Sequence, residues 1–298
     1  MSANSILPSA PRRARAFLPA ATAALVALAP AADAAPRKTS APAACRLETV
    51  ATGTVKSVID GRTFVLADGR EVRLAGIEVP PLPGGAGPAP IKVAATPAVE
   101  RAPDQGLAAT AALRALIAGR AVSLRHSKFV TDRYGRILAD AVAADTESPS
   151  AVKSLLSQGL ARLAAHPGEP ACVADLRTAE RAARAAKLGL WGDPRYFPKA
   201  ADDPAGVLAE RGRFTLVEGK VVSVRESGGT IYMNFGRRWS EDFTVTILKR
   251  NERQFTAAGL ALRSLAGRRV LVRGWIEQRG GPWIEATGPE QIEVIGEK

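Results

Sequence analysis

Apolar and polar residues alternate in short runs from Thr52 onward, which is the pattern of half-buried β-strands. Three such runs, TGTVKSVID, TFVLA and REVRLAGI, are separated by Asp-Gly pairs at residues 60–61 and 68–69. Asp-Gly is favoured in tight hairpin turns, so the pattern predicts a three-stranded meander. Residues 80–105 then contain seven prolines and several glycines, which predicts a long surface loop.

Helical spacing replaces alternation in later segments. Residues 107–119 and 150–159 each end in a glycine, a common helix terminator, and residues 172–191 form an amphipathic pattern in which arginines fill the polar positions. Two further strands, AVSLRHSKFV and ILADAVAA, flank the charged turn TDRYGR. Five strands with helices inserted late are typical of a small barrel of the OB type.

A second strand-rich unit begins at Phe214, where FTLVEGKVVSVRE, TIYMNF and DFTVTIL precede a helical segment and the strand RRVLVRGWIEQRG. This order predicts a second OB-like β-barrel. We therefore expect a mostly β protein with helices (α+β), with one domain over residues 51–196, a linker over 197–212 and a second domain over 213–298.

The first 34 residues have the pattern of an export signal. Arginines precede an apolar stretch, and ADA at residues 32–34 offers the small side chains of a cleavage site. The apolar run is short and interrupted by prolines, so no stable membrane anchor is expected. Residues 35–50 are interpreted as a linker, and the protein is expected to be periplasmic or secreted.

The chain has two cysteines, Cys45 and Cys172. In an exported protein an even pair most simply forms one disulfide, which would join the segment before the first strand to a late helix. A lipid-anchored cysteine and two free thiols are the alternatives.

The formal net charge of +12 favours acidic partners such as nucleic acid, anionic lipid or cell-wall polymer. A basic surface can also serve only to keep a protein soluble. The net charge therefore does not identify which of these partners, if any, is bound.

Five motifs, VIDGRTFVL, VRLAGIEVP, DRYGR, LLSQGLARL and AERAARAAKLGLW, stand in an order that identifies a family. Residues 52–192 resemble the staphylococcal (thermo)nuclease family. The resemblance implies a five-stranded OB barrel with three helices and a calcium-dependent phosphodiesterase activity.

The resemblance places two phosphate-clamping arginines at Arg73 and Arg136, with Tyr134 in the turn beside Arg136 and Glu78 as the remaining acidic group of the catalytic set. An arginine fork suits a phosphate because it donates two parallel hydrogen bonds. The alternatives are a solvent-facing strand arginine at Arg73 and a turn arginine paired with Asp132 at Arg136.

The implied metal pocket departs from the family pattern. Arg62 replaces the first carboxylate ligand, Glu78 replaces an aspartate, Val79 replaces a threonine, and Pro81 replaces the glutamate that positions the attacking water. Asp60, a peripheral acid, is unaltered.

Coulomb's law decides the consequence of this change. At about 4 Å and an effective dielectric constant near 20, a unit charge and a divalent cation interact by about 8 kcal/mol. Millimolar to micromolar affinity amounts to only about 4–8 kcal/mol. We therefore expect Arg62 to pair with Glu78 or Asp60, no metal and no other cofactor, and Ca²⁺ only if the family site survives.

The second unit contains NFGRRWSEDF, in which Phe235 and Trp239 surround Arg237 and Arg238. This mixture suits nucleic acid or another anionic polymer on an OB-like surface. The alternative places the aromatic rings in a core and the arginines in solvent.

Three functions remain open at this point. The first is a thermonuclease-like protein that binds nucleic acid or another phosphate polymer and has lost calcium-dependent hydrolysis. The second is an active nuclease that uses Arg73, Glu78 and Arg136. The third is an envelope interaction module without a nucleic-acid role.

Overall fold

The computed structural model describes residues 45, 47–84, 104–144 and 150–296. The expected export signal over residues 1–34 lies outside the described residues, as do most of the proline-rich loop and of the linker over 35–50. No helix in the described part of the chain is long and apolar enough to cross a membrane.

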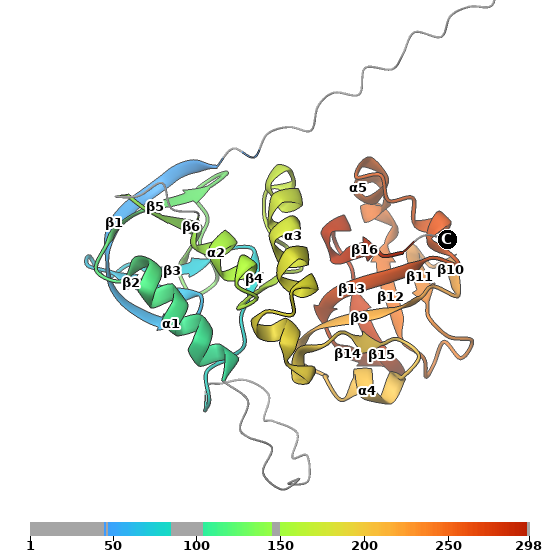
Figure 1. The fold of residues 1–298 in the computed structure, drawn as a ribbon. Helices are drawn as coiled ribbons and strands as arrows, with labels where there is room; N and C mark the ends of the chain where they lie inside the picture. Colours follow the sequence, from blue (N-terminus) through green and yellow to red (C-terminus); the bar gives the residue numbers. More distant parts are fainter. Residues whose placement is uncertain (1–44, 46, 85–103, 145–149, 297–298) are drawn as a thin grey trace, which may run out of the picture. The chain divides into compact units, whose positions relative to one another are not determined.

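Five strands of the first domain close into a barrel in the order β1-β2-β3-β6-β5 (Figure 1). They are β1 (Glu48–Asp60), β2 (Thr63–Leu66), β3 (Glu71–Leu74), β5 (Ala121–His126) and β6 (Ile137–Ala143). The pair β3–β6 is parallel and the other pairs are antiparallel. The predicted meander and five-stranded barrel are confirmed.

Three α-helices accompany the barrel, as expected: α1 (Gln105–Ile117), α2 (Ala151–Ser157) and α3 (Pro170–Ala185). Helix α1 begins at Asp104, whose carboxylate caps the first turn by accepting from the backbone N–H groups of Gly106 and Leu107. A small separate sheet joins β4 (Ile77–Glu78) to β7 (Arg162–Leu163). Two 3₁₀ helices, η1 (Gly189–Gly192) and η2 (Pro194–Tyr196), follow α3.

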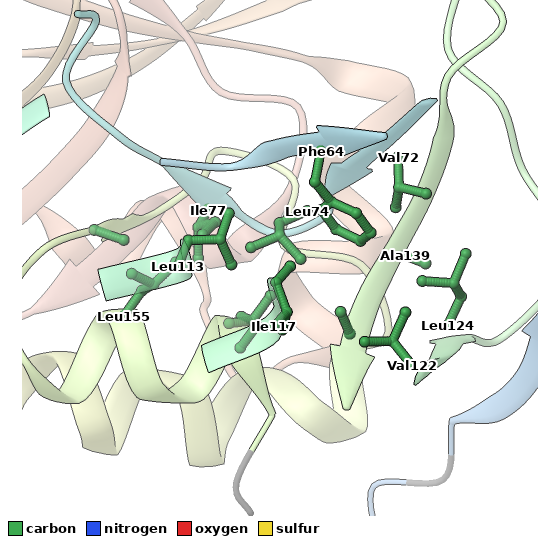
Figure 2. Packing of buried hydrophobic residues seen from close by; sticks show 14 of the residues in the cluster. Phe64, Val72, Leu74, Ile77, Leu113, Ile117, Val122, Leu124, Ala139 and Leu155 are labelled. Carbon is green, nitrogen blue, oxygen red and sulfur yellow. The ribbon is translucent and has the colours of Figure 1, made fainter. Parts of the chain in front are cut away.

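The core of this domain lies between the barrel strands and the helices. Figure 2 shows Phe64 and Leu74 from the strands facing Leu113 of α1 and Leu155 of α2. All four side chains are at most 2% exposed. Burying side chains of this size contributes about 1.5–3 kcal/mol each, so this contact fixes the strands that hold the candidate site.

The C-terminal strands form two sheets, ordered β10-β11-β12-β15-β14 and β16-β13-β9-β8, around a second hydrophobic core. The strands are β8 (Lys199–Ala200), β9 (Phe214–Lys220), β10 (Ser223–Ser227), β11 (Thr230–Asn234), β12 (Thr244–Leu248), β13 (Arg269–Trp275), β14 (Glu277–Arg279), β15 (Gly281–Glu285) and β16 (Ile292–Val294). The helices are α4 (Pro204–Leu208), α5 (Glu252–Ala257), η3 (Lys249–Asn251), η4 (Leu262–Leu265) and η5 (Pro289–Gln291). The parallel pair β12–β15 resembles the parallel pair of the first barrel, and the second OB-like barrel stays a prediction.

Residues 197–212, interpreted as a linker from their composition, contain regular structure instead. Strand β8 pairs with β9, and Val207 of α4 belongs to the second core. The segment is therefore part of the C-terminal fold. The polar residues of this segment suggested a linker, but Asp203 is the N-cap of α4, where its carboxylate accepts from the Gly206 N–H.

Ion pairs join α3 to the C-terminal strands. The fully buried Arg273 of β13 donates from both terminal nitrogens to the fully buried Glu180, at 3.0 and 2.8 Å. Glu293 of β16 accepts from Arg181 and Arg184 of α3, at 2.8 and 3.0 Å. The arginine-rich face of α3 is therefore a contact surface within the chain.

Candidate anion-binding site

The first turn of the barrel holds the residue that decides the chemistry of the site. β1 ends at Asp60 and β2 begins at Thr63, and between them the Arg62 N–H donates to Asp60 Oδ1 over 2.8 Å. The Arg62 side chain reaches β4, where Nη1 forms an ion pair with Glu78 Oε2 and donates to the Ile77 carbonyl over 3.2 Å. Both partners of the ion pair are mostly buried, with side chains 15% and 18% exposed.

The second turn repeats the tripeptide Asp-Gly-Arg and makes a different contact. Arg70 N–H donates to Asp68 Oδ1 over 3.1 Å, as in the first turn, but Arg70 Nε returns to Asp68 Oδ2 over 2.8 Å. This second pair is exposed, with side chains at 41% and 50%. The same local sequence therefore gives a surface pair in one turn and a link to β4 in the other, because only Arg62 faces Glu78.

The other positions of the implied metal pocket supply little. Val79 packs against the core of the first domain, and Pro81 is exposed. Within the described residues, no group of three or more His, Cys, Asp or Glu is arranged to hold a metal ion. Since hard divalent cations need several oxygen ligands, and one Glu78 oxygen and one Asp60 oxygen are already used by Arg62, these residues do not fit calcium.

Arg73 is the arginine of the site that lacks a direct acidic partner. It lies on β3, opposite Thr63 of β2 and beside Leu138 of β6. Its side chain makes no hydrogen bond or ion pair with the part of the chain that the structure describes. Burial lowers the pKa of Arg73, and the positive charges of Arg62 and Arg136 lower that pKa further. An anion at this point would remove an unfavourable charge arrangement.

Arg136 is held beside its turn by an ion pair. Its Nη2 and Nε atoms both lie 2.7 Å from Asp132 Oδ2, and its backbone N–H donates to Asp132 Oδ1 over 3.1 Å. This is the alternative that the sequence left open for Arg136, although its charge still acts on Arg73. Tyr134 is 66% exposed, and its ring lies 5.0 Å from the Arg136 guanidinium. The turn thus presents an aromatic face and a fixed cation.

The C-terminal candidates separate into core and surface. Phe235 is only 6% exposed and packs on Phe243 at 5.0 Å, so its ring is a core residue. Trp239 is 76% exposed and Arg237 is exposed, whereas Arg238 forms an exposed ion pair with Glu241 at 3.0 Å. For Phe235 the core alternative therefore holds.

The sequence did not single out Arg162, which stands directly opposite Glu78 in the pair β4–β7. Its guanidinium lies 5.9 Å from the ring of Tyr196 and 5.4 Å from the ring of Phe214. No local signal could have found this contact, because the rings come from η2 and β9.

The predicted disulfide is present. Cys45 and Cys172 are bonded, with Cα atoms 4.5 Å apart and a sequence separation of 127 residues. It ties the segment before β1 to the first turn of α3. The alternatives of free thiols and of a lipid-anchored Cys45 therefore do not apply to this structure.

Part of the chain matches a known protein family. Residues 71–193 match the family described as staphylococcal nuclease homologue. The match contains Arg73, Glu78 and Arg136 and stops short of Asp60 and Arg62, which the barrel brings to the same place. A search of proteins with curated functions found no match.

Proposed function

We propose, from the premise that residues 71–193 form a staphylococcal nuclease homologue domain, that this protein binds nucleic acid or another phosphate polymer and does not hydrolyse it with calcium. The site of binding is the surface around Arg73 and Arg136. The observation that carries the proposal is the ion pair between Arg62 and Glu78, since it places a cation where the family has a metal ligand.

The bound group is expected to be an anion because of the charges that surround Arg73. Two further guanidinium groups act on it, and each of those already has a carboxylate partner. Arginine retains its charge even when burial lowers its pKa. A phosphate diester carries one negative charge and two free oxygens, so it suits a guanidinium fork that is not otherwise paired.

Export of the protein is part of the proposal. The disulfide between Cys45 and Cys172 supports it, because disulfides persist mainly in oxidising compartments such as the periplasm. The export signal predicted over residues 1–34 agrees with this location.

An active nuclease is the second candidate. It is favoured by the presence of Arg73, Glu78 and Arg136 in one site together with the DRYGR turn. In that case Glu78 would have to leave Arg62 to act on a water molecule. An envelope interaction module is the third candidate, and it predicts no affinity for phosphate polymers.

A binding and cleavage assay separates these candidates. The full chain is incubated with single-stranded DNA and with RNA in calcium, in magnesium and in chelator. We expect binding that weakens steeply with salt and no cleavage. Cleavage that chelator stops and Arg136→Ala removes would establish the second candidate, and the absence of salt-sensitive binding would favour the third.

Two arginine variants test the location of the site. Arg73→Ala is expected to weaken binding more than Arg136→Ala, because Asp132 already holds the Arg136 guanidinium. Each lost phosphate contact should reduce the slope of log K against log salt by about one. Arg70→Ala, which removes an exposed arginine of the second Asp-Gly-Arg turn, is the matched control and should leave both quantities unchanged.

A further inference from the structure

Beside the arginines of the site the first domain presents the exposed ring of Tyr134, and the chain that follows it is poor in aromatic side chains. No Phe, Tyr or Trp occurs between Tyr134 and Trp191. Stacking of bases on aromatic rings is the usual source of affinity for single strands beyond the phosphate contacts. If the site around Arg73 binds several nucleotides of such a strand, the rings beyond that of Tyr134 come from another part of the chain.

The structure brings such rings to the edge of the site through Arg162. Residues directly opposite in an antiparallel pair have Cβ atoms about 4.5–5.5 Å apart, so Arg162 is an immediate neighbour of Glu78. The negative charge of Glu78 acts both on Arg73 and on Arg162. Glu78 therefore stands between the phosphate-binding arginine and a second arginine.

Arg162 in turn contacts the C-terminal part of the chain. Its Nη2 donates to the Phe214 carbonyl over 2.9 Å, and its guanidinium lies near the rings of Phe214 and Tyr196. The ring of Trp275 meets the Phe214 ring edge-on at a centroid distance of 6.3 Å. These contacts join four side chains into one continuous group, which we call the aromatic group: Arg162, Tyr196, Phe214 and Trp275.

The exposure of these residues differs in a way that suits a ligand. Phe214 is buried and Tyr196 is half-buried, whereas Trp275 is 50% exposed. Arg162 Nε is buried without a hydrogen-bond partner in the described residues, and no carboxylate there lies within ion-pair distance of its guanidinium. An exposed indole at the end of this group, together with a guanidinium that has no carboxylate in ion-pair contact, is an arrangement that a nucleotide can complete.

We propose that Tyr196 and Trp275 form the base-stacking wall of the site, and that the ligand is a single-stranded nucleic acid whose phosphates lie on Arg73. Arg162 positions the wall by holding Tyr196 and Phe214. The proposal rests on the proposed function and adds the class of polymer. It also gives the C-terminal strands a role in binding, since Trp275 belongs to β13.

The test compares two probes for the full chain. One is a labelled oligothymidylate of about 12 nucleotides, within the site sizes of single-strand binders. The other is an abasic oligomer of the same length, which has the phosphates without the bases. Trp275→Ala and Tyr196→Ala are expected to weaken oligothymidylate binding by about five- to a hundredfold each and to leave abasic binding unchanged.

Conservative variants serve as controls, and one tryptophan variant tests a competing surface. Trp275→Phe and Tyr196→Phe keep a ring and should retain most of the affinity, which excludes a general loss of folding. Trp239→Ala tests the other candidate surface, because it removes an indole that is 76% exposed in the loop after β11, and the inference predicts that it has no effect. An unfolding midpoint is measured for each variant.

Four outcomes would overturn the inference. Equal losses for both probes would show that the aromatic group acts only on folding. A loss confined to Trp239→Ala would place the stacking in the loop after β11. Binding that depends on Arg73 and is indifferent to Tyr196 and Trp275 would refute the wall and leave the proposed function standing. If the unaltered chain binds neither probe, both proposals fail.

Discussion

Arg62→Asp is expected to create calcium binding, which the proposed function denies to the unaltered chain. The change removes a cation that is in contact with Glu78 and adds a carboxylate between Asp60 and Glu78. At about 4 Å and an effective dielectric constant near 20, removing the guanidinium relieves about 8 kcal/mol of repulsion toward a divalent cation. The side chain is 15% exposed, so solvent screening reduces this figure, and we expect a Kd between millimolar and micromolar.

The assay is thermal unfolding with calcium and with chelator, supported by calorimetric titration. Without calcium the variant should unfold at a lower temperature than the unaltered chain, because three carboxylates then lie together. A ligand at about 100 times its Kd stabilises a protein by about 2.7 kcal/mol, so about 10 mM calcium should restore the midpoint if Kd is about 0.1 mM. Hydrolysis is not expected to return, since Pro81 provides no acid.

Arg70→Asp is the matched control for this experiment. It makes the same change of charge in the same Asp-Gly-Arg tripeptide. The Arg70 side chain, however, pairs with Asp68 at the surface and forms no hydrogen bond or ion pair with Glu78 in the described residues. Calcium should not shift its midpoint. The reasoning would be refuted if calcium stabilised the unaltered chain as much as the Arg62→Asp variant, or if the two aspartate variants responded alike.

Three further predictions concern stability. Burial raises the pKa of Asp140 to about 6 from its ordinary 3.8, so this carboxyl carries no ionisation penalty well below pH 3.8 and destabilises the fold increasingly as pH rises from 3.8 to 6. Asp140→Asn should therefore raise the free energy of unfolding by at most about 3 kcal/mol at pH 7.5 and by less than about 1 kcal/mol near pH 4, as denaturant titrations at the two pH values will show. Arg273→Ala should cost about 3–5 kcal/mol in the same titration because it leaves the buried Glu180 without an ion-pair partner, whereas Arg269→Ala, which breaks an exposed pair, should cost less than about 1 kcal/mol. Cys172→Ala should lower the free energy of unfolding by about 2–5 kcal/mol, and a reductant should then have no further effect on the variant.

The barrel could be predicted from the sequence because its signals are local. Alternation along β1, β2 and β3 and the Asp-Gly pairs at 60–61 and 68–69 specify strands and turns without reference to the rest of the chain. The choice between Asp60 and Glu78 as the partner of Arg62 could not be made in this way. The structure uses both, the backbone N–H for Asp60 and the side chain for Glu78, and the second contact depends on how β4 returns to the turn.

The arginines of α3 show where such reasoning ends. An amphipathic pattern identifies the apolar face of a helix and leaves the polar face to solvent by default. Here that face binds Glu293 and the Glu290 carbonyl, more than 100 positions later in the chain. Phe235 illustrates the opposite error, since a ring between polar residues suggested a surface and belongs to the core. Both outcomes depend on long-range contacts that carry no local signature.

The Arg62–Glu78 ion pair also explains how the first turn of the barrel and β4 can stay joined without a metal ion. In the family pattern that the resemblance implies, carboxylates of the first turn and of β4 would hold a cation; here the Arg62 guanidinium links the same two elements with its own hydrogen bonds to Glu78 and to the Ile77 carbonyl. A mostly buried pair of this kind is costly to break when one partner is removed. Under the proposed function, the exchange removes the ion and its chemistry, while the ion pair holds in one position the Glu78 carboxylate whose charge acts on both Arg73 and Arg162. Positioned arginines without a Lewis acid are what binding without turnover requires.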